Sequence, residues 1–534
     1  MINNSHIWIN TFFKKHDILY TEIDILVYSY SDIYFDERKK NMKKIFCLVL
    51  AILMLSAVLV SCKKPNEQEG SQGTVTTPVS TDPNRVAPEV KDFGGYEFKF
   101  ILNNDSGNEG FEVQAPLELT GEGVNDTIYS RNKMVEGLYN IKIVDRMNLH
   151  PTSDESFSYL SNAALSGDYY ADVYGALCSR LTQRLAPQGF FYNVYDLQSL
   201  RLDSEWWDQD FLDEMTINGY AYSLTGDIQP NDDLRQNAIA LNLSLYEETY
   251  PEKNIHEIVV TNGAWTMDEF YKTWNEFGSF DGGQTGMMDE GDLVGFLYDS
   301  RTANYMYMAS GLKAFSMQNG QPVLLISSDK ALKVVDWLQK IVDGQSGLKS
   351  ARVESAGGYE LGSSHFAAGQ ILMSVNQFIG SLSTQLNMED DVVYPPFPKY
   401  DDTQDRYYSV VHKDFSPIAI SANVTDKERT ALILEVLAFY SEKLQSEVMD
   451  ILIQERLTSE IEPREILQMT LNSKTYDLEY MGDIMGWTTR VNKMIQENQL
   501  SNYAAEMKSI ESNAITTRGN GKLQLFLRNY AKIK

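Results

Sequence analysis

The sequence has very little cysteine, with three residues in 534. Cys47 lies inside an apolar segment and Cys62 ends that segment, so only Cys178 remains in the body of the chain. A single remaining thiol excludes an intrachain disulfide. The fold must therefore be held by a hydrophobic core, and a chain with 43% hydrophobic residues can build a large one.

Basic residues and histidines are also scarce. Lysine and arginine number 46 against 74 acidic residues, which gives a formal net charge of −28. A chain this acidic repels nucleic acid and anionic lipid surfaces, so we expect neither as a partner. The four histidines after Cys62 are His150, His256, His365 and His412. They lack the spacing of metal ligands, and the sequence predicts no metal ion and no cofactor.

Long apolar runs are absent after Cys62, but one precedes it. Ile45–Val60 follows Lys43 and Lys44 and ends at Ser61-Cys62. The run is too short for a permanent membrane span and is typical of a secretory signal. Because a small residue and a cysteine end it, residues 42–61 are predicted to be a lipoprotein signal peptide. Cys62 would be acylated and would anchor the protein to the cell membrane, on its extracytoplasmic side.

The segments on either side of the signal are treated separately. Residues 1–41 place acidic side chains ahead of the signal, so we interpret them as an upstream extension from a misassigned start codon, with Met42 as the initiator. A translated extension is the alternative. Residues 62–93 are rich in Pro, Gly, Ser, Thr and Gln, which predicts a flexible tether. Folded structure is expected from about Gly94.

Strand and helix patterns alternate along the next part of the chain. Tyr96–Phe100 alternates apolar and polar residues as a strand does, and Val124–Tyr139 has the spacing of an amphipathic helix. Further strands are predicted at 141–144, 171–174 and 238–241, and further helices at 156–165, 266–277, 329–342, 426–440 and in the tail from 462. This alternation favours an α/β fold with a mostly parallel sheet.

Four short motifs then occur in a fixed order. They are Gly167–Val173 (GDYYADV), Gly263–Asp268 (GAWTMD), Phe366–Met373 (FAAGQILM) and Pro396–Asp401 (PFPKYD), the last followed by Gln404 and Tyr407. Behind a lipoprotein signal, this series resembles extracellular solute-binding protein family 1. These proteins are the substrate-binding lipoproteins of bacterial ABC importers, and the carbohydrate-oriented group includes maltodextrin binders.

The resemblance implies a two-lobed, periplasmic-binding-protein-like α/β fold of type II, with discontinuous lobes joined by a hinge. Lobe 1 would take residues 94–230 and about 398–450, and lobe 2 would take 231–397 and about 451–534. It further implies a monomer that binds a small solute, a sugar or oligosaccharide, between the lobes. That solute would be delivered to the permease subunits of an ABC transporter, without catalysis.

Ligand contacts are expected just after strands, because in open α/β sheets the carboxyl ends of the strands face the binding crevice. Trp207 and Trp487 are added as stacking candidates, since polar, turn-like sequence borders both. The complete set of predicted ligand-binding residues is Asn103, Asn104, Asp105, Asp227, Gln229, Asn376, Gln377, Phe378, Trp207 and Trp487. The alternative is that the polar members are ordinary loop residues.

Two other classes of protein stay open at this point. A secreted glycoside hydrolase would need a pair of carboxylates whose separation the sequence does not show. A surface glycan-capture lipoprotein would share the signal and the aromatic residues, but strand–helix alternation argues against its usual helical-repeat body. No convincing catalytic constellation occurs in the sequence, and we expect a binding protein.

Overall fold

The structure is a computed structural model of the chain. It describes residues 85–531 apart from 103–118, 120, 122, 146–152, 279–287, 289–290, 350–361, 377–389, 445, 448–449 and 451–460. All of the described residues belong to one compact unit, Thr77–Lys534. The extension 1–41, the signal 42–61 and the lipidation candidate Cys62 lie outside the described residues.

The described strands form two sheets and two small strand pairs. The strands are β1 (Tyr96–Leu102), β2 (Ile141–Asp145), β3 (Val173–Gly175), β4 (Ala238–Asn242), β5 (Val294–Tyr298), β6 (Phe315–Gln318), β7 (Gln321–Leu324), β8 (Gly347–Lys349), β9 (Ile371–Asn376), β10 (Val392–Val393), β11 (Ser409–Val410), β12 (Ile418–Ile420) and β13 (Lys474–Thr475). The first sheet has the order β12-β3-β1-β2, and the second has the order β10-β4-β9-β5-β8.

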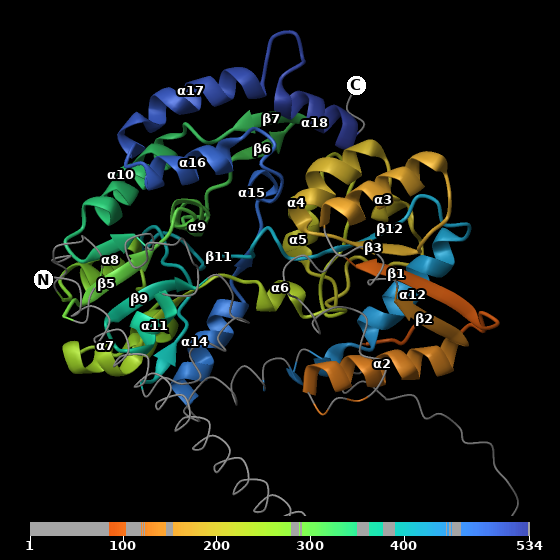
Figure 1. Ribbon diagram of the computed structural model, residues 1–534, viewed down its shortest axis with the longest axis horizontal. Helices are drawn as coiled ribbons and strands as arrows, with labels where there is room; N and C mark the ends of the chain where they lie inside the picture. The colour runs from red at the N-terminus through yellow and green to blue at the C-terminus, as the bar shows by residue number, and fades with distance from the viewer. Residues whose placement is uncertain are drawn as a thin grey trace, which may run out of the picture. The chain divides into compact units, whose positions relative to one another are not determined.

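Helices connect and cover these strands (Figure 1). They are α2 (Gly123–Tyr139), α3 (Ser153–Ser166), α4 (Cys178–Arg180), α5 (Gln209–Met215), α6 (Asn231–Leu234), α7 (Leu243–Thr249), α8 (Met267–Asn275), α9 (Thr302–Ala309), α10 (Asp329–Asp343), α11 (Gly362–Ala367), α12 (Lys427–Phe439), α14 (Ile461–Leu471), α15 (Leu478–Gly482), α16 (Trp487–Gln496), α17 (Tyr503–Ala514) and α18 (Lys522–Tyr530). The strands and helices predicted from periodicity are therefore confirmed, with shifts of a few residues at their ends.

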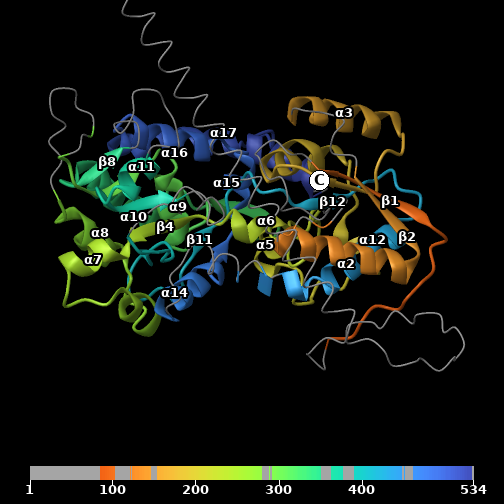
Figure 2. The same ribbon diagram turned by 60° about the horizontal axis from the view of Figure 1, so that its bottom comes forward.

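The first sheet lies between two helical layers. Strands β1, β2 and β3 run parallel, while β12 runs antiparallel to β3. Helix α3 lies on one face, and α2 with α12 lies on the other, as two views show (Figures 1 and 2). Burial on both faces explains why the successive residues Phe100 and Ile101 of β1 are both buried, as are Val173 and Tyr174 of β3.

The second sheet is mixed. Strand β5 runs parallel to β8 and β9, and β4 runs antiparallel to β9 and β10. Helix α8 contacts β5, and α10 contacts β8. We use "first lobe" for the first sheet with the helices packed on it, and "second lobe" for the second sheet with its helices.

The chain crosses between the sheets more than once. Strands β1–β3 belong to the first sheet, β4, β5, β8, β9 and β10 form the second, and β12 then returns to the first. The sheet order β2-β1-β3-β12, with an antiparallel returning strand, makes the first lobe discontinuous, as the type II fold requires. Strand β11 lies between β10 and β12 in the sequence, and its parallel partner β13 follows β12.

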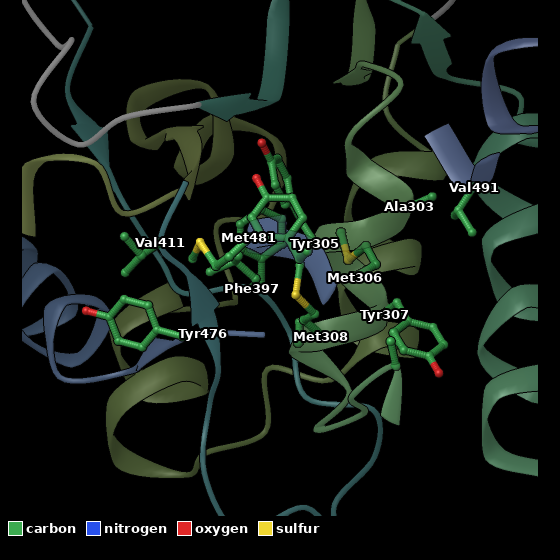
Figure 3. Close-up of a cluster of buried hydrophobic side chains, with 14 of the residues drawn as sticks. Ala303, Tyr305, Met306, Tyr307, Met308, Phe397, Val411, Tyr476, Met481 and Val491 are labelled. Carbon is green, nitrogen blue, oxygen red and sulfur yellow. The ribbon is translucent and has the colours of Figure 1, made fainter. Parts of the chain in front are cut away.

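Helix α9 lies in the interior, and every one of its residues is buried. Tyr305 lies beside Phe397 and Met481, whereas Val491 of α16 lies on the side of Ala303 (Figure 3). A helix that is buried all round lies in a core. It therefore packs the second lobe against the segments that return through β11 and α15.

Two of the motifs behind the family resemblance, 263–268 and 396–401 with Tyr407, pack against each other. The Trp265 indole Nε1 donates to the Pro396 carbonyl at 3.0 Å, and the Trp265 amide donates to the Tyr407 hydroxyl at 3.3 Å. The Lys399 amide donates to the Trp265 carbonyl, also at 3.0 Å. Because Trp265 is fully buried, these motifs hold the start of α8 against the later crossover.

Asp172, in the first motif, has a similar structural role. It is fully buried, and it accepts hydrogen bonds from the Tyr96 hydroxyl at 2.6 Å and the Tyr169 hydroxyl at 2.9 Å. The Lys99 amide donates a third, at 2.8 Å. A buried carboxylate needs such partners, so Asp172 fixes the start of β3 against β1.

The last part of the expected tether is held on the first lobe. Arg85 donates to the Phe439 carbonyl at 2.9 Å, and its guanidinium lies over the Trp206 ring at 5.1 Å. The Tyr139 hydroxyl donates to the Pro88 carbonyl at 3.1 Å. Regular secondary structure begins with the turn at Gly94 and Gly95, and the contacts of Arg85 and Pro88 hold the residues before it on the first lobe.

Candidate functional site

A pocket lies beside the crossovers, with a volume of about 680 Å³. Its wall takes residues from three stretches of the chain, which are Glu205 with 207–210, then Gly226, Asp227 and Asp233 of the first crossover, and then Ser446, Asp450, Arg464, Gln468, Leu471, Asn472 and Lys474. Small-molecule sites usually measure about 300–1,000 Å³, so the pocket has the size of a solute site.

The wall of the pocket is strongly acidic. Its carboxylates are Glu205, Asp208, Asp210, Asp227, Asp233 and Asp450, and its cations are Arg464 and Lys474. Gln209, Gln468 and Asn472 add amide groups that both donate and accept hydrogen bonds. Such a wall suits a polar solute rich in hydroxyl or amine donors.

Lys474 joins the three stretches of this wall. Its Nζ lies 3.1 Å from Asp208 Oδ2, 3.0 Å from Asp232 Oδ2 and 2.8 Å from Asp233 Oδ1. Asp208 also caps the N-terminus of α5, accepting from the Phe211 amide at 2.8 Å. One ammonium group therefore fixes β13, α5 and α6 together at the crossovers.

The carboxylates around Lys474 respond to burial in different ways. Burial raises the pKa of Asp232 to about 7, and Asp233 and Asp208 repel its negative charge while Lys474 attracts it. Burial also opposes ionisation of Asp208, but Lys474 and the Phe211 amide hold the pKa of Asp208 below its usual value. The three carboxylates together hold the pKa of Lys474 well above its usual value, against the effect of burial.

Asp227, a predicted site residue, does line the pocket. Burial raises its pKa to about 7, and the charge of Asp233 acts in the same direction. Arg85 Nη2 lies 3.9 Å from Asp227 Oδ2 and acts in the opposite direction. The held end of the tether thus contributes a positive charge beside the pocket.

Gln229, predicted with Asp227, is not among the residues that line the pocket. Its side chain is buried, and its Nε2 donates to the Ser416 carbonyl at 2.8 Å. This bond joins the first crossover to the residues that precede β12. Gln229 therefore has a structural role here.

The side chains of the two stacking candidates are both buried. Trp207 is 1% exposed and donates from its indole to Glu435 at 3.0 Å. Trp487 is fully buried, donates to the Tyr503 hydroxyl at 3.2 Å, and lies 4.7 Å from the ring of Tyr307. Neither indole presents an open face to a ligand.

The remaining predicted residues follow strand ends. Asn103, Asn104, Asp105, Gln377 and Phe378 lie outside the described residues. Asn376 is the last residue of β9 and pairs with Ala238 through the backbone. These six stay predictions.

Reasoning from the sequence missed Lys474, Asp208, Asp232 and Asp233. Asn231-Asp232-Asp233 directly follows the turn at Pro230, and this acidic run at a crossover was a usable signal. Lys474 carried none, because it lies in an ordinary polar segment far from its partners in the sequence. Only the fold brings its ammonium group to the three carboxylates.

The described residues contain no group of three or more His, Cys, Asp or Glu placed to hold a metal ion. Around Asp208, Asp232 and Asp233, the Lys474 ammonium is the cation that the carboxylates contact. Among the described helices, none combines the length and the apolar character needed to cross a membrane.

No protein-family model matches the sequence. A comparison with curated proteins found no match either. Solved structures do match. A cyclo/maltodextrin-binding protein complexed with maltotetraose is similar with a TM-score of 0.50 and 14% identity, over 79% of this chain and 99% of that one. The fold is that of a two-lobed solute-binding protein.

Other solved structures are similar at comparable levels. The galacto-N-biose/lacto-N-biose I-binding protein of an ABC transporter from Bifidobacterium longum has a TM-score of 0.49 at 12% identity, covering 83% of this chain and 99% of that one. An extracellular solute-binding protein family 1 member from Alicyclobacillus acidocaldarius has a TM-score of 0.49 at 10% identity, with the same coverage. The likeness to the cyclo/maltodextrin-binding protein, at a TM-score of 0.50, confirms the two-lobed type II fold that the sequence motifs imply.

Proposed function

We propose that the protein is an extracytoplasmic solute-binding protein that captures a sugar or oligosaccharide between its two lobes. The bound solute would be delivered to the permease of an ABC importer. The observation that carries the proposal is the discontinuous first sheet, in which β12 returns after the whole second sheet. Two lobes joined by several chain crossovers can rotate toward each other around a ligand.

The comparisons and the pocket support this proposal in different ways. The structure with a TM-score of 0.50 is a cyclo/maltodextrin-binding protein complexed with maltotetraose. The pocket wall offers carboxylate and amide groups that could accept hydrogen bonds from sugar hydroxyls. Anchoring through acylated Cys62 belongs to the same proposal, since a tethered binding protein stays near its permease.

A thermal-shift screen tests the proposal directly. A solute that binds only the folded state raises the melting temperature by mass action. We expect one or more oligosaccharides, such as maltotetraose, to stabilise the protein while free amino acids and peptides do not. Stabilisation by a peptide alone would contradict the carbohydrate assignment.

Two substitutions then locate the bound solute. Calorimetric titration of Asn376→Ala and Asp227→Asn with the stabilising sugar should show affinity reduced by about 1–3 kcal/mol wherever a hydrogen bond to the ligand is lost. Asp336→Asn, at an exposed position on α10, is the matched control and should bind as the wild type does. Wild-type affinity in both test variants would exclude these positions from the site.

A further inference from the structure

The last two long helices contact different lobes. Helix α17 packs against α10 and α16. The Tyr503 hydroxyl donates to the Ile326 carbonyl at 2.8 Å, just before α10, and Arg490 of α16 forms an ion pair with Glu506 at 2.9 Å. Since α10 contacts β8 of the second sheet, α17 belongs with the second lobe.

Helix α18 contacts the first lobe instead. It packs against η3, the 3₁₀ helix Ala186–Gln188. The Tyr530 hydroxyl donates to the Met215 carbonyl at 2.9 Å, and the Tyr222 hydroxyl donates to the Tyr530 carbonyl at 2.8 Å. The rings of Tyr222 and Tyr530 meet edge to face with centroids 5.0 Å apart.

These partners are firmly part of the first lobe. Leu224, two residues after Tyr222, forms an antiparallel bridge with Ile418 of β12. Met215 ends α5, and Phe211 of the same helix packs edge to face against Phe415 at 5.5 Å. A pull on α18 would therefore act on the first sheet.

The connection between α17 and α18 is short and close-packed. A Cβ on Gly521 would lie 2.2 Å from the Ala514 carbonyl oxygen, so the two helix ends approach as closely as a glycine allows. Gln524 accepts from the Thr516 amide at 2.9 Å and from the Gly521 amide at 3.1 Å. The two helices thus form one stiff hairpin rather than a loose tail.

We propose that the α17–α18 hairpin is a strap that restrains how far the two lobes separate. One end is fixed by Tyr503 on the second lobe, and the other by Tyr530 on the first. Because Tyr530 is 1% exposed and carries hydrogen bonds in both directions, opening on this side requires breaking buried polar contacts.

A second set of polar contacts lies beside the strap and also restrains the separation of the two lobes. Lys313, just before β6, forms an ion pair with Glu214 of α5, and the Ala314 amide donates to Asp477 Oδ2 at 3.0 Å. Glu214 also accepts from the Leu478 amide at 2.8 Å. The strap therefore adds to a polar seam between α5 and the segments before β6 and α15.

The test measures the distance between spin labels on the two lobes. Labels are placed at Lys133→Cys on α2 and Glu248→Cys on α7, in the full chain with its three natural cysteines changed to serine. Three forms are compared: one ending at Gly521, one carrying Tyr222→Phe with Tyr530→Phe, and a control carrying Leu525→Ala. Leu525 lies on α18 but is 42% exposed.

Without added solute, the form ending at Gly521 should show a broader interlobe distance distribution with a longer mean distance. The double phenylalanine form should shift in the same direction by less, and the Leu525→Ala form should match the wild type. Circular dichroism establishes that each form is folded. If the shortened form does not fold, the double phenylalanine form decides. A wild-type distribution in the deciding form would overturn the proposal, whether or not any sugar binds.

Discussion

Lys474 Nζ lies 3.0 Å from Oδ2 of Asp232, a residue that is completely buried. Two more carboxylates, on Asp208 and Asp233, lie within 3.1 Å of the same ammonium group. The buried negative charge at the crossovers thus depends on one lysine from a distant part of the chain. A buried ion pair gives little net stability, but removing one partner leaves an uncompensated charge.

Lys474→Met should therefore destabilise the protein strongly. Three buried carboxylates lose their counter-charge, and we expect a loss of about 3–5 kcal/mol in the free energy of unfolding, measured in urea. Lys493→Met is the control, because Lys493 is largely exposed and pairs with Glu497 at 3.6 Å. Equal losses in the two variants would show that the ion pairs around Lys474 do not contribute specially to stability.

Stability should fall as the pH rises from about 5 to 8. Burial raises the pKa values of Asp227, Asp232 and Glu214 to about 7 each. A carboxyl whose pKa is raised by folding binds its proton more tightly in the folded state. Its stabilising effect is complete below the unfolded pKa near 4 and is lost as the pH rises through about 7.

Asp227→Asn supplies the matched test of this pH dependence. Each such carboxyl contributes a slope of up to about 1.4 kcal/mol per pH unit between its two pKa values. Removing Asp227 should make the slope shallower by up to that amount in urea titrations at pH 5.5, 6.5 and 7.5. A stability that rises steadily with pH in the wild type would contradict the assignment.

Trp487→Phe should weaken folding without weakening solute binding. The variant loses the hydrogen bond to the Tyr503 hydroxyl and part of the packing on Tyr307, so we expect about 0.5–3 kcal/mol lower stability. Calorimetric titration with the sugar found by the screen should give wild-type affinity. The reverse pattern, intact stability with lost affinity, would restore Trp487 as a ligand contact.

Arg85→Ala should release the end of the tether from the first lobe. Without the bond to the Phe439 carbonyl and the contact with Trp206, the exposed Lys91 should be cut faster by trypsin. Mass spectrometry of the fragments over time gives the rate. Arg518→Ala removes an exposed arginine elsewhere and is the control. Equal cleavage at Lys91 in both variants would mean that Arg85 does not hold the segment.

Local patterns predicted the elements well, and tertiary contacts decided the rest. The strand at Tyr96–Phe100 could be predicted because the alternation of apolar and polar residues lies within the strand itself. The burial of Trp487 could not be predicted, since its neighbours in the sequence are polar and Tyr307, which packs on it, is distant in the sequence. Likewise, the role of Lys474 depends on Asp208 and Asp232, which precede it by most of the second lobe.

The late return of β12 has a consequence for how the chain folds. Ile420 pairs with Val173, and the entire second sheet lies between them in the sequence. The first sheet therefore stays incomplete until β12 has been synthesised, and closing so long a loop slows folding. Until β12 has been made, a newly synthesised chain of this topology leaves one edge of β3 without its partner strand.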